Sequence, residues 1–262
     1  MIWEGENTKA SPASATPPSL EAFTHNISLD ELLRAAANPA LTEDLALSLL
    51  QRADLPVEAL ERLSKNGSVL KLRKIKFALA SHPHTPRRVS VPLIRQFYTF
   101  DLMKVSLTPS VPTDVKVAAD DVLISRLKTV TLGERLALAR RGSSRIAGAM
   151  LLDGDARVMQ IALENARLTE IFVIQAVLRP EARTALVQAV AHHPKWSFRR
   201  EVRIALLRTE YLSLARTLEF SHGLPAPLLR DLLHSSRLPA RIKEQVLRET
   251  QAGSALGGFA PR

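Results

Sequence analysis

The chain has 262 residues, of which 46% are hydrophobic and only 5% aromatic, and it carries a net charge of +10. This length allows one or two domains with an ample core of Leu, Ala, Val and Ile. The complete absence of cysteine excludes disulfides, thiolate nucleophiles and cysteine-based zinc or iron–sulfur sites.

Both ends of the chain differ in composition from its middle. Residues 1–25 are rich in Ser, Thr, Ala and Pro without an apolar period, which predicts a disordered tail, and the glycine-containing segment 251–262 is interpreted likewise. Glu4 and Glu6 stand where a signal peptide needs basic residues, and no apolar run is long enough to predict a transmembrane helix. We therefore expect a cytoplasmic protein with one helical repeat domain over residues 26–250.

The ordered part begins with a series of predicted short helices. Ser28 and Glu31 match a capping box before the first apolar face, and Thr42 is predicted to cap the next helix. Asp54 and Thr85 are predicted to cap two more, each just ahead of a proline. The same pattern continues to residue 250, so the sequence predicts about fifteen helices of roughly 8–15 residues and no strand.

Similar corner segments separate these helices. They recur with a mean interval of about 26 residues, which is typical of a solenoid. The residue before a proline is disfavoured in a helix, and Asn and His tolerate left-handed or irregular helix ends and bond the last carbonyls. The clearest copies occupy residues 38–42, 82–86, 108–112, 165–169 and 193–197.

The segments at residues 80–86, 154–158, 162–165 and 168–170 resemble the leucine-rich repeat variant, a family related to HEAT-like arrays. This resemblance implies an all-α fold, an α-solenoid superhelix of about eight short helical-pair repeats. It also implies a binding surface and no reaction. Some family members hold an iron–sulfur centre in an N-terminal cysteine cluster, but this chain has no cysteine, so no cofactor is expected.

The residue types that could support catalysis or metal binding have simpler interpretations. The histidines, including His82 and His193, fall at corners, so no metal site is predicted. Asp120 and Asp121 point about 100° apart on a helix and are interpreted as a solvated face. No nucleophile elbow or phosphate loop is present, and Trp196 alone does not furnish the aromatic pocket of a HEAT-like DNA glycosylase. We therefore do not expect an enzyme.

Charge supplies the remaining functional signal. Residues 1–60 have a net charge of −6 and residues 61–262 a net charge of +16, which favours an acidic partner, although a basic surface can also serve solubility alone. The first hypothesis is a scaffold that binds a protein partner through its concave or edge surface. The alternative is a nucleic-acid binder whose basic stripe contacts phosphates, and we expect two separate patches rather than one track. The predicted binding residues are Lys71, Lys74, Arg87, Arg88, Arg140, Arg141, Arg199 and Arg200.

Overall fold

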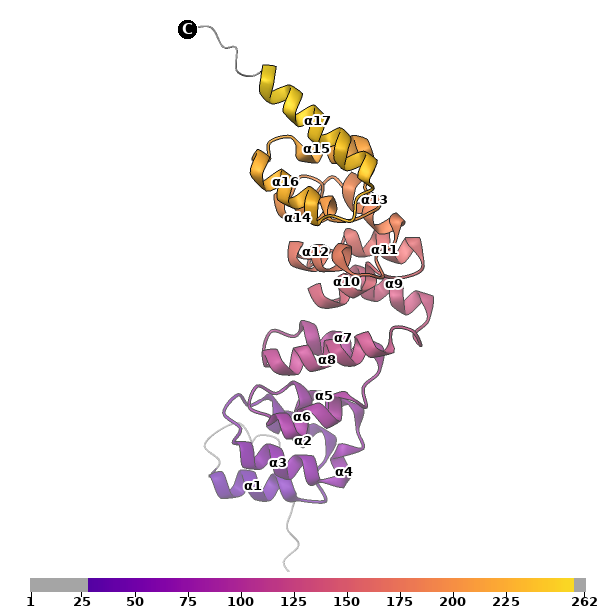
Figure 1. The fold of residues 1–262 in the computed structure, drawn as a ribbon. Coiled ribbons are helices and arrows are strands. Elements are labelled where there is room, and N and C mark those ends of the chain that lie inside the picture. The colour runs from indigo at the N-terminus through magenta and orange to yellow at the C-terminus, as the bar shows by residue number, and fades with distance from the viewer. Residues whose placement is uncertain (1–27, 257–262) are drawn as a thin grey trace, which may run out of the picture. The chain divides into compact units, whose positions relative to one another are not determined.

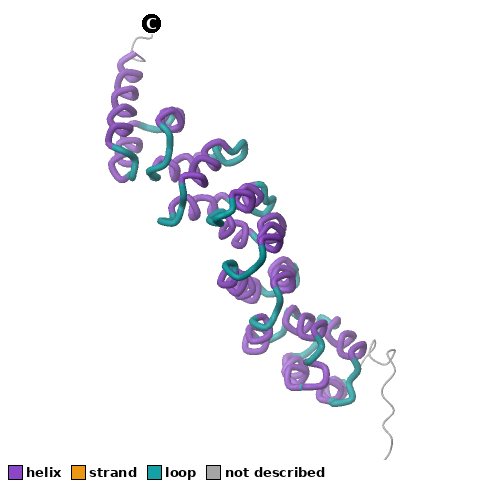
Figure 2. Tube along the Cα trace, turned by 90° about the vertical axis from the view of Figure 1, so that its right-hand side faces the viewer, coloured by secondary structure: helices purple, strands orange, loops and turns teal. Residues whose placement is uncertain are grey.

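The computed structural model describes residues 28–256, with side chains for residues 28–250. Within this part, the chain forms seventeen α-helices joined by short loops and no strand, which confirms the all-α prediction (Figure 2). The predicted tail over residues 1–25 lies outside the described residues. The last helix ends at Leu256, inside the predicted tail over 251–262, and the residues beyond it lie outside the described part.

The chain divides into two compact units, with the boundary between Leu93 and Ile94. In unit 1, α1 packs against α3, and α2 packs against α5 (Figure 1). The helices up to this boundary are α1 (Leu29–Ala37), α2 (Glu43–Gln51), α3 (Val57–Lys65), α4 (Gly67–Leu70), α5 (Arg73–Ser81) and α6 (Arg87–Ile94).

Unit 2 holds two rows of helices. One row runs through α8, α10, α12, α14 and α16, each in contact with the next. In the other row α9 contacts α11, α11 contacts α13, and α15 contacts α17, while α7 pairs with α8 (Figure 1). The helices are α7 (Thr99–Leu107), α8 (Thr113–Arg126), α9 (Leu132–Arg141), α10 (Ser144–Met150), α11 (Ala156–Leu163), α12 (Glu170–Leu178), α13 (Thr184–His192), α14 (Arg200–Leu207), α15 (Leu214–Ser221), α16 (Ala226–Ser235) and α17 (Ala240–Leu256).

Local sequence signals explain where several helices begin. The capping box at α1 forms as predicted, because Ser28 Oγ accepts from the Glu31 amide at 3.3 Å and Glu31 Oε2 accepts from the Ser28 amide at 2.9 Å. Thr42 Oγ1 accepts from the Leu45 amide at 3.4 Å and so caps α2. The core between the helices consists mainly of buried Leu, Ala, Val and Ile, as the composition predicts.

Two predicted caps are wrong. Asp54 does not cap α3: its carboxylate accepts from the Arg52 guanidinium at 2.8 Å, and the helix begins at Val57. Thr85 does not cap α6, because its hydroxyl donates to the Leu79 carbonyl at 2.6 Å, at the end of the preceding helix. In both cases the proline that follows supplies the first carbonyl acceptor of the helix, so a side-chain cap placed before it is out of register.

The corners are joined by side-chain hydrogen bonds that link residues 26 to 33 positions apart in the sequence. Asn66 is buried, and its Nδ2 donates to the carbonyls of Ala36 at 3.2 Å and Asn38 at 2.9 Å, which end the neighbouring helix α1. Its Oδ1 accepts from the Ser68 amide at 3.2 Å, which closes a tight turn. One asparagine therefore shapes its own corner and satisfies the carbonyls of the corner before it.

Histidine replaces asparagine in the same role at another corner. His82 Nδ1 accepts from the His84 amide at 3.2 Å, so the ring proton resides on Nε2, which lies 2.9 Å from the Arg52 carbonyl. Burial lowers the pKa of His82, which keeps the ring neutral in this arrangement. The backbone of His82 is extended, with φ −71° and ψ 133°, so this corner takes the irregular helix end rather than the left-handed one among the two that the sequence allows.

Unit 2 repeats this link twice. Asn165 Nδ2 donates to the Ala139 carbonyl at 2.7 Å, and Trp196 Nε1 donates to the Leu163 carbonyl at 3.1 Å. These bonds join the corner at residues 142–143 to that at 164–169, and that one to the corner at 193–199. We call this series of corners the first edge of unit 2. The corners at residues 151–155, 179–183, 208–213 and 236–239, at the opposite ends of the helices in the α8–α16 row, form the second edge.

Candidate functional site

The predicted basic residues of unit 1 are exposed, but two of them are paired with carboxylates. Lys74 Nζ lies 3.3 Å from Glu43 Oε1, and the Arg88 guanidinium forms an ion pair with Glu61. Both pairs join neighbouring helices at the surface, where such pairs contribute little stability. Each carboxylate offsets the charge of the cation beside it. Lys71 and Arg87 are also exposed, after α4 and at the start of α6.

The predicted basic residues of unit 2 lie together on the first edge. Arg140 and Arg141 are the last two residues of α9. Arg199 stands directly before α14, and Arg200 is the first residue of that helix. All four side chains are exposed, and none is paired with a carboxylate of the described residues. Two corners that are far apart in the sequence therefore present unpaired guanidinium groups on one edge. The expected division of the predicted basic residues into two separate patches stays a prediction.

Sequence reasoning located the corner between these two pairs but did not include its basic residue among the predicted binding residues. Arg167 stands on this middle corner, is exposed, and has no carboxylate partner within the described part of the chain. Lys195, on the third corner, is exposed with its Nζ 4.2 Å from the centroid of the Trp196 ring. The repeat spacing of 26 or 27 residues from Arg140 and Arg141 was the available signal for Arg167. The basic series of the first edge is Arg140, Arg141, Arg167, Lys195, Arg199 and Arg200.

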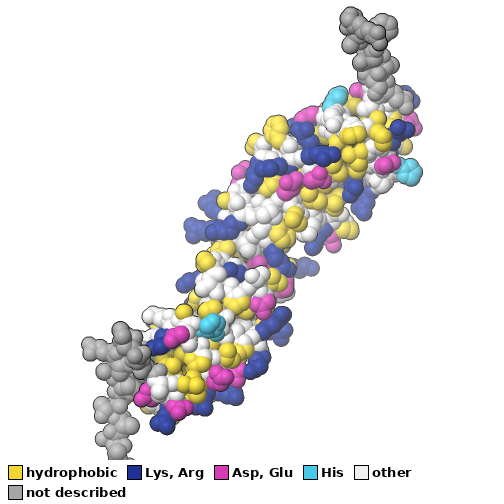
Figure 3. Space-filling view, turned by 90° about the vertical axis from the view of Figure 1, so that its left-hand side faces the viewer, with side chains coloured by type: hydrophobic (Ala, Val, Ile, Leu, Met, Phe, Trp, Pro, Cys, Tyr) yellow, Lys and Arg dark blue, Asp and Glu magenta, His cyan; other side chains and the backbone are white. Residues whose placement is uncertain are grey.

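Exposed apolar side chains accompany this basic series. Ile171, in the first turn of α12, is 64% exposed, and Phe198, just before α14, is 73% exposed. The first edge also contains two acids: Glu170 begins α12, and Glu164 Oε1 lies 3.2 Å from Nε2 of the buried His193. Figure 3 shows one face of the molecule, on which Lys and Arg side chains lie among apolar and acidic ones. The first edge thus combines unpaired cations with large exposed apolar groups.

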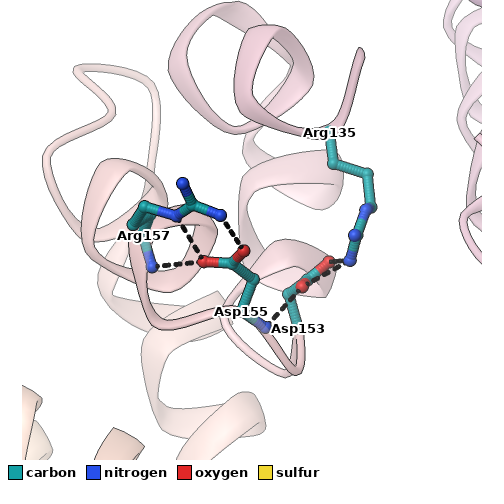
Figure 4. Close-up of polar contacts among 4 residues, drawn as sticks. All are labelled: Arg135, Asp153, Asp155 and Arg157. Atoms are coloured by element: carbon teal, nitrogen blue, oxygen red, sulfur yellow. Dashed lines mark hydrogen bonds and ion pairs between the residues drawn. The ribbon is translucent and has the colours of Figure 1, made fainter. Parts of the chain in front are cut away.

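The corner between α10 and α11, on the second edge, shows the opposite arrangement. Arg135 donates from one nitrogen to both carboxylate oxygens of Asp153, at 2.7 and 2.8 Å, and the Asp153 side chain is only 6% exposed (Figure 4). Arg157 binds Asp155 at 2.7 Å, and its hydrogen bonds lower the pKa of that carboxyl to about 2. Arginines at this corner are occupied by structural ion pairs and do not contribute cations for a partner.

The prediction of a solvated face for the two adjacent aspartates of α8 is right for one residue and wrong for the other. Asp121 is solvated and pairs with Arg145 at 2.7 Å, as expected for a surface residue. Asp120 is buried instead: its Oδ2 accepts from Ser143 Oγ at 2.8 Å, and its Oδ1 has no hydrogen-bond partner. Burial raises the pKa of Asp120. The prediction of a solvated face is therefore wrong for this residue, which is buried and bonded to Ser143 at the start of α10.

No group of three or more His, Asp or Glu side chains between residues 28 and 250 could hold a metal ion. None of the described helices is both long and apolar enough to cross a membrane. No protein-family model, no curated protein and no solved structure matches the chain. The first edge has to be interpreted from its own chemistry.

Proposed function

We propose that the chain is a non-enzymatic helical-repeat scaffold of the α-solenoid type, which binds a protein partner through the first edge of unit 2. The recurring corners, the rows of contacting helices and the hydrogen bonds between successive corners support the solenoid interpretation. Stacked repeats place equivalent residues side by side, so an edge of this kind presents a regular surface to an extended segment.

The observation that supports this function is the combination of unpaired arginines with exposed apolar side chains on one edge. Arginine and aromatic residues are enriched where proteins bind one another, and charged partners are selected by complementary potential. Arg199 and Arg200 directly follow Phe198 in the sequence, and Ile171 comes four residues after Arg167. A polypeptide segment that alternates acidic and apolar residues would satisfy both kinds of group.

Nucleic acid is the second candidate, and a specific observation supports it. The five arginines of the first edge lack carboxylate partners in the described part of the chain, as phosphate contacts require. A polypeptide fits better for two reasons. Glu164 and Glu170 lie within the same edge and would repel a continuous phosphate backbone. Phe198 is also the only strongly exposed aromatic residue there, which is too few for a series of stacked bases.

The test measures binding of two labelled probes by fluorescence anisotropy, using the full chain. One probe is a peptide of alternating glutamate and leucine residues, and the other is a single-stranded oligonucleotide of about 20 nucleotides. We expect the peptide to bind more tightly. Reversal of Arg140, Arg141, Arg199 and Arg200 to glutamate should weaken peptide binding by more than about tenfold.

A matched control tests whether the change in net charge alone accounts for the loss of binding. Lys74 and Arg88, together with Arg230 and Arg241 elsewhere on the surface, are exposed and can be reversed to give the same change in net charge. This control variant should bind the peptide more strongly than the first-edge variant. Equal losses in both variants would show that binding follows net charge alone and would contradict the proposal. Tighter binding of the oligonucleotide, lost in the first-edge variant, would favour the second candidate.

A further inference from the structure

A cavity of about 250 Å³ opens on the second edge of unit 2, where α12 and α14 end and α16 is followed by its last corner. Arg179, Arg208 and Arg237 all line it. They are spaced 29 residues apart, so they hold equivalent positions at three successive corners. The spacing is regular enough to be found in the sequence, but the sequence alone does not show that the three side chains share a cavity.

The backbone around the cavity is held by hydrogen bonds between elements. The Arg237 amide donates to the Arg208 carbonyl at 3.1 Å, which fixes two of the three corners to each other. Gln188 Nε2, from α13, donates to the Tyr211 carbonyl at 2.6 Å and anchors the wall between them. Arg208 and Arg237 therefore start from fixed positions, which lowers the cost of ordering their side chains around a ligand.

A purely structural role would bring arginines to helix ends as donors to the last carbonyls. Arg126, at the end of α8 in the same row, shows that role: its guanidinium donates to the Phe97 carbonyl at 2.7 Å and to the Arg95 carbonyl at 2.5 Å. Arg179, Arg208 and Arg237 differ, because none of their guanidinium groups has a carbonyl or carboxylate partner among the described residues. All three are exposed at the cavity.

The cavity has one carboxylate, that of Glu210, and its partner Tyr211 also lines the cavity. Glu210 forms a hydrogen bond with the Tyr211 hydroxyl, which raises the pKa of that tyrosine. With three arginines and one glutamate in its lining, the cavity has a net charge of +2. A small dianion would balance this charge.

We propose that this cavity binds the phosphoryl group of a phosphate monoester. The planar guanidinium fork matches two phosphate oxygens at once, so two adjacent arginines can hold one phosphoryl group by charge-assisted hydrogen bonds. The cavity is smaller than the sites of drug-sized ligands, so it suits the phosphoryl group and a few neighbouring atoms. Arg208 lies between the other two corners and contributes to either pair. The site is separate from the first edge and does not depend on the function proposed there.

Isothermal titration of the full chain tests this site with three probes: inorganic phosphate, phosphoserine and a short peptide that contains phosphoserine. We expect saturable binding to a single site. Arg208→Gln should weaken it by about tenfold or more, and Arg208→Lys by less, because lysine keeps the charge but loses the fork. Tighter binding of the peptide than of phosphoserine would identify a phosphorylated protein as the source, and equal binding a free phosphate compound.

Controls separate this site from the rest of the surface. Arg230→Gln removes an exposed arginine of α16 outside the cavity and should leave phosphate binding unchanged. Reversal of Arg199 and Arg200 should also leave it unchanged, so failure of the first-edge proposal would be seen independently. Absence of saturable binding up to about 10 mM phosphate, or equal binding by the Arg208→Gln and Arg230→Gln variants, would overturn the proposal.

Discussion

Replacement of Asn66 by alanine tests the hydrogen bonds that join neighbouring corners. The substitution removes the two bonds from Nδ2 to the carbonyls of Ala36 and Asn38, and the bond from the Ser68 amide to Oδ1. Asn38 offers a matched comparison in the same unit. Its Oδ1 accepts from the Ala40 amide at 2.9 Å, but the residue is exposed and its side chain forms no bond to another corner within the described residues. The two alanine variants lose the same local turn and differ in the link between corners.

The expected magnitudes follow from this difference. A typical intramolecular hydrogen bond contributes about 1 kcal/mol, and a buried carbonyl left without a partner costs a further 1–3 kcal/mol or so. Asn66→Ala should therefore lower the free energy of unfolding by about 2–4 kcal/mol, and Asn38→Ala by less than about 1 kcal/mol. Asn66→Asp should be worse than alanine at neutral pH, because it directs a carboxylate at two carbonyl oxygens.

Urea unfolding measures both losses, and amide hydrogen exchange over residues 36–41 locates them. Faster exchange at this corner in Asn66→Ala, with little change in Asn38→Ala, is the pattern expected if the bonds act between corners. Equal losses of stability in the two variants would refute the reasoning, since the local turn alone would then account for the role of asparagine.

Three further predictions concern buried titratable groups. Burial raises the pKa of Asp120, so the folded protein loses stability as the pH rises through the raised pKa and the carboxyl ionises. Asp120→Asn should therefore stabilise the protein at pH 7. Urea unfolding should show a gain in the free energy of unfolding that becomes smaller at acidic pH. Burial lowers the pKa of His82, so the contribution of its neutral ring to the free energy of unfolding is complete above the ordinary pKa of 6.5 and is lost as the pH falls through the lowered pKa. Hydrogen exchange of the amides near the Arg52 carbonyl should therefore become faster in acid. His82→Asn should remove this pH dependence. Asp153→Ala should cost about 2 kcal/mol in thermal unfolding, because it leaves the half-buried Arg135 without its partner, and replacing both residues by leucine should cost less.

The helices were predictable because their signals are local. The capping box of Ser28 and Glu31 and the cap at Thr42 depend on residues within three or four positions, and both form. The caps expected at Asp54 and Thr85 did not form, because each side chain has another partner nearby in the sequence. Thr85 bonds the end of the helix before it, and Asp54 binds Arg52, since the prolines after them shift the helix start.

The bonding partners of the corner residues were harder to predict from the sequence. The sequence marks Asn66 and His82 as helix ends, but the carbonyls that they bond belong to residues 28 or 30 positions earlier. Only the packing of one helix on the next decides which carbonyls those are. The same limit applies to Asp120, which is buried and bonded to Ser143 at the start of α10.

Ion pairs with carboxylates distinguish the basic residues of unit 1 from those of unit 2, which the net charge of the sequence does not. Lys74 and Arg88 look as cationic in the sequence as Arg199 and Arg200, yet the first two face Glu43 and Glu61 across neighbouring helices. An acidic partner would have to displace these carboxylates in unit 1, whereas the first edge of unit 2 offers arginines without such competition. A surface stabilised by its own ion pairs therefore contributes less to recognition than an equal number of unpaired cations, and this difference is the reason to assign partner binding to the first edge.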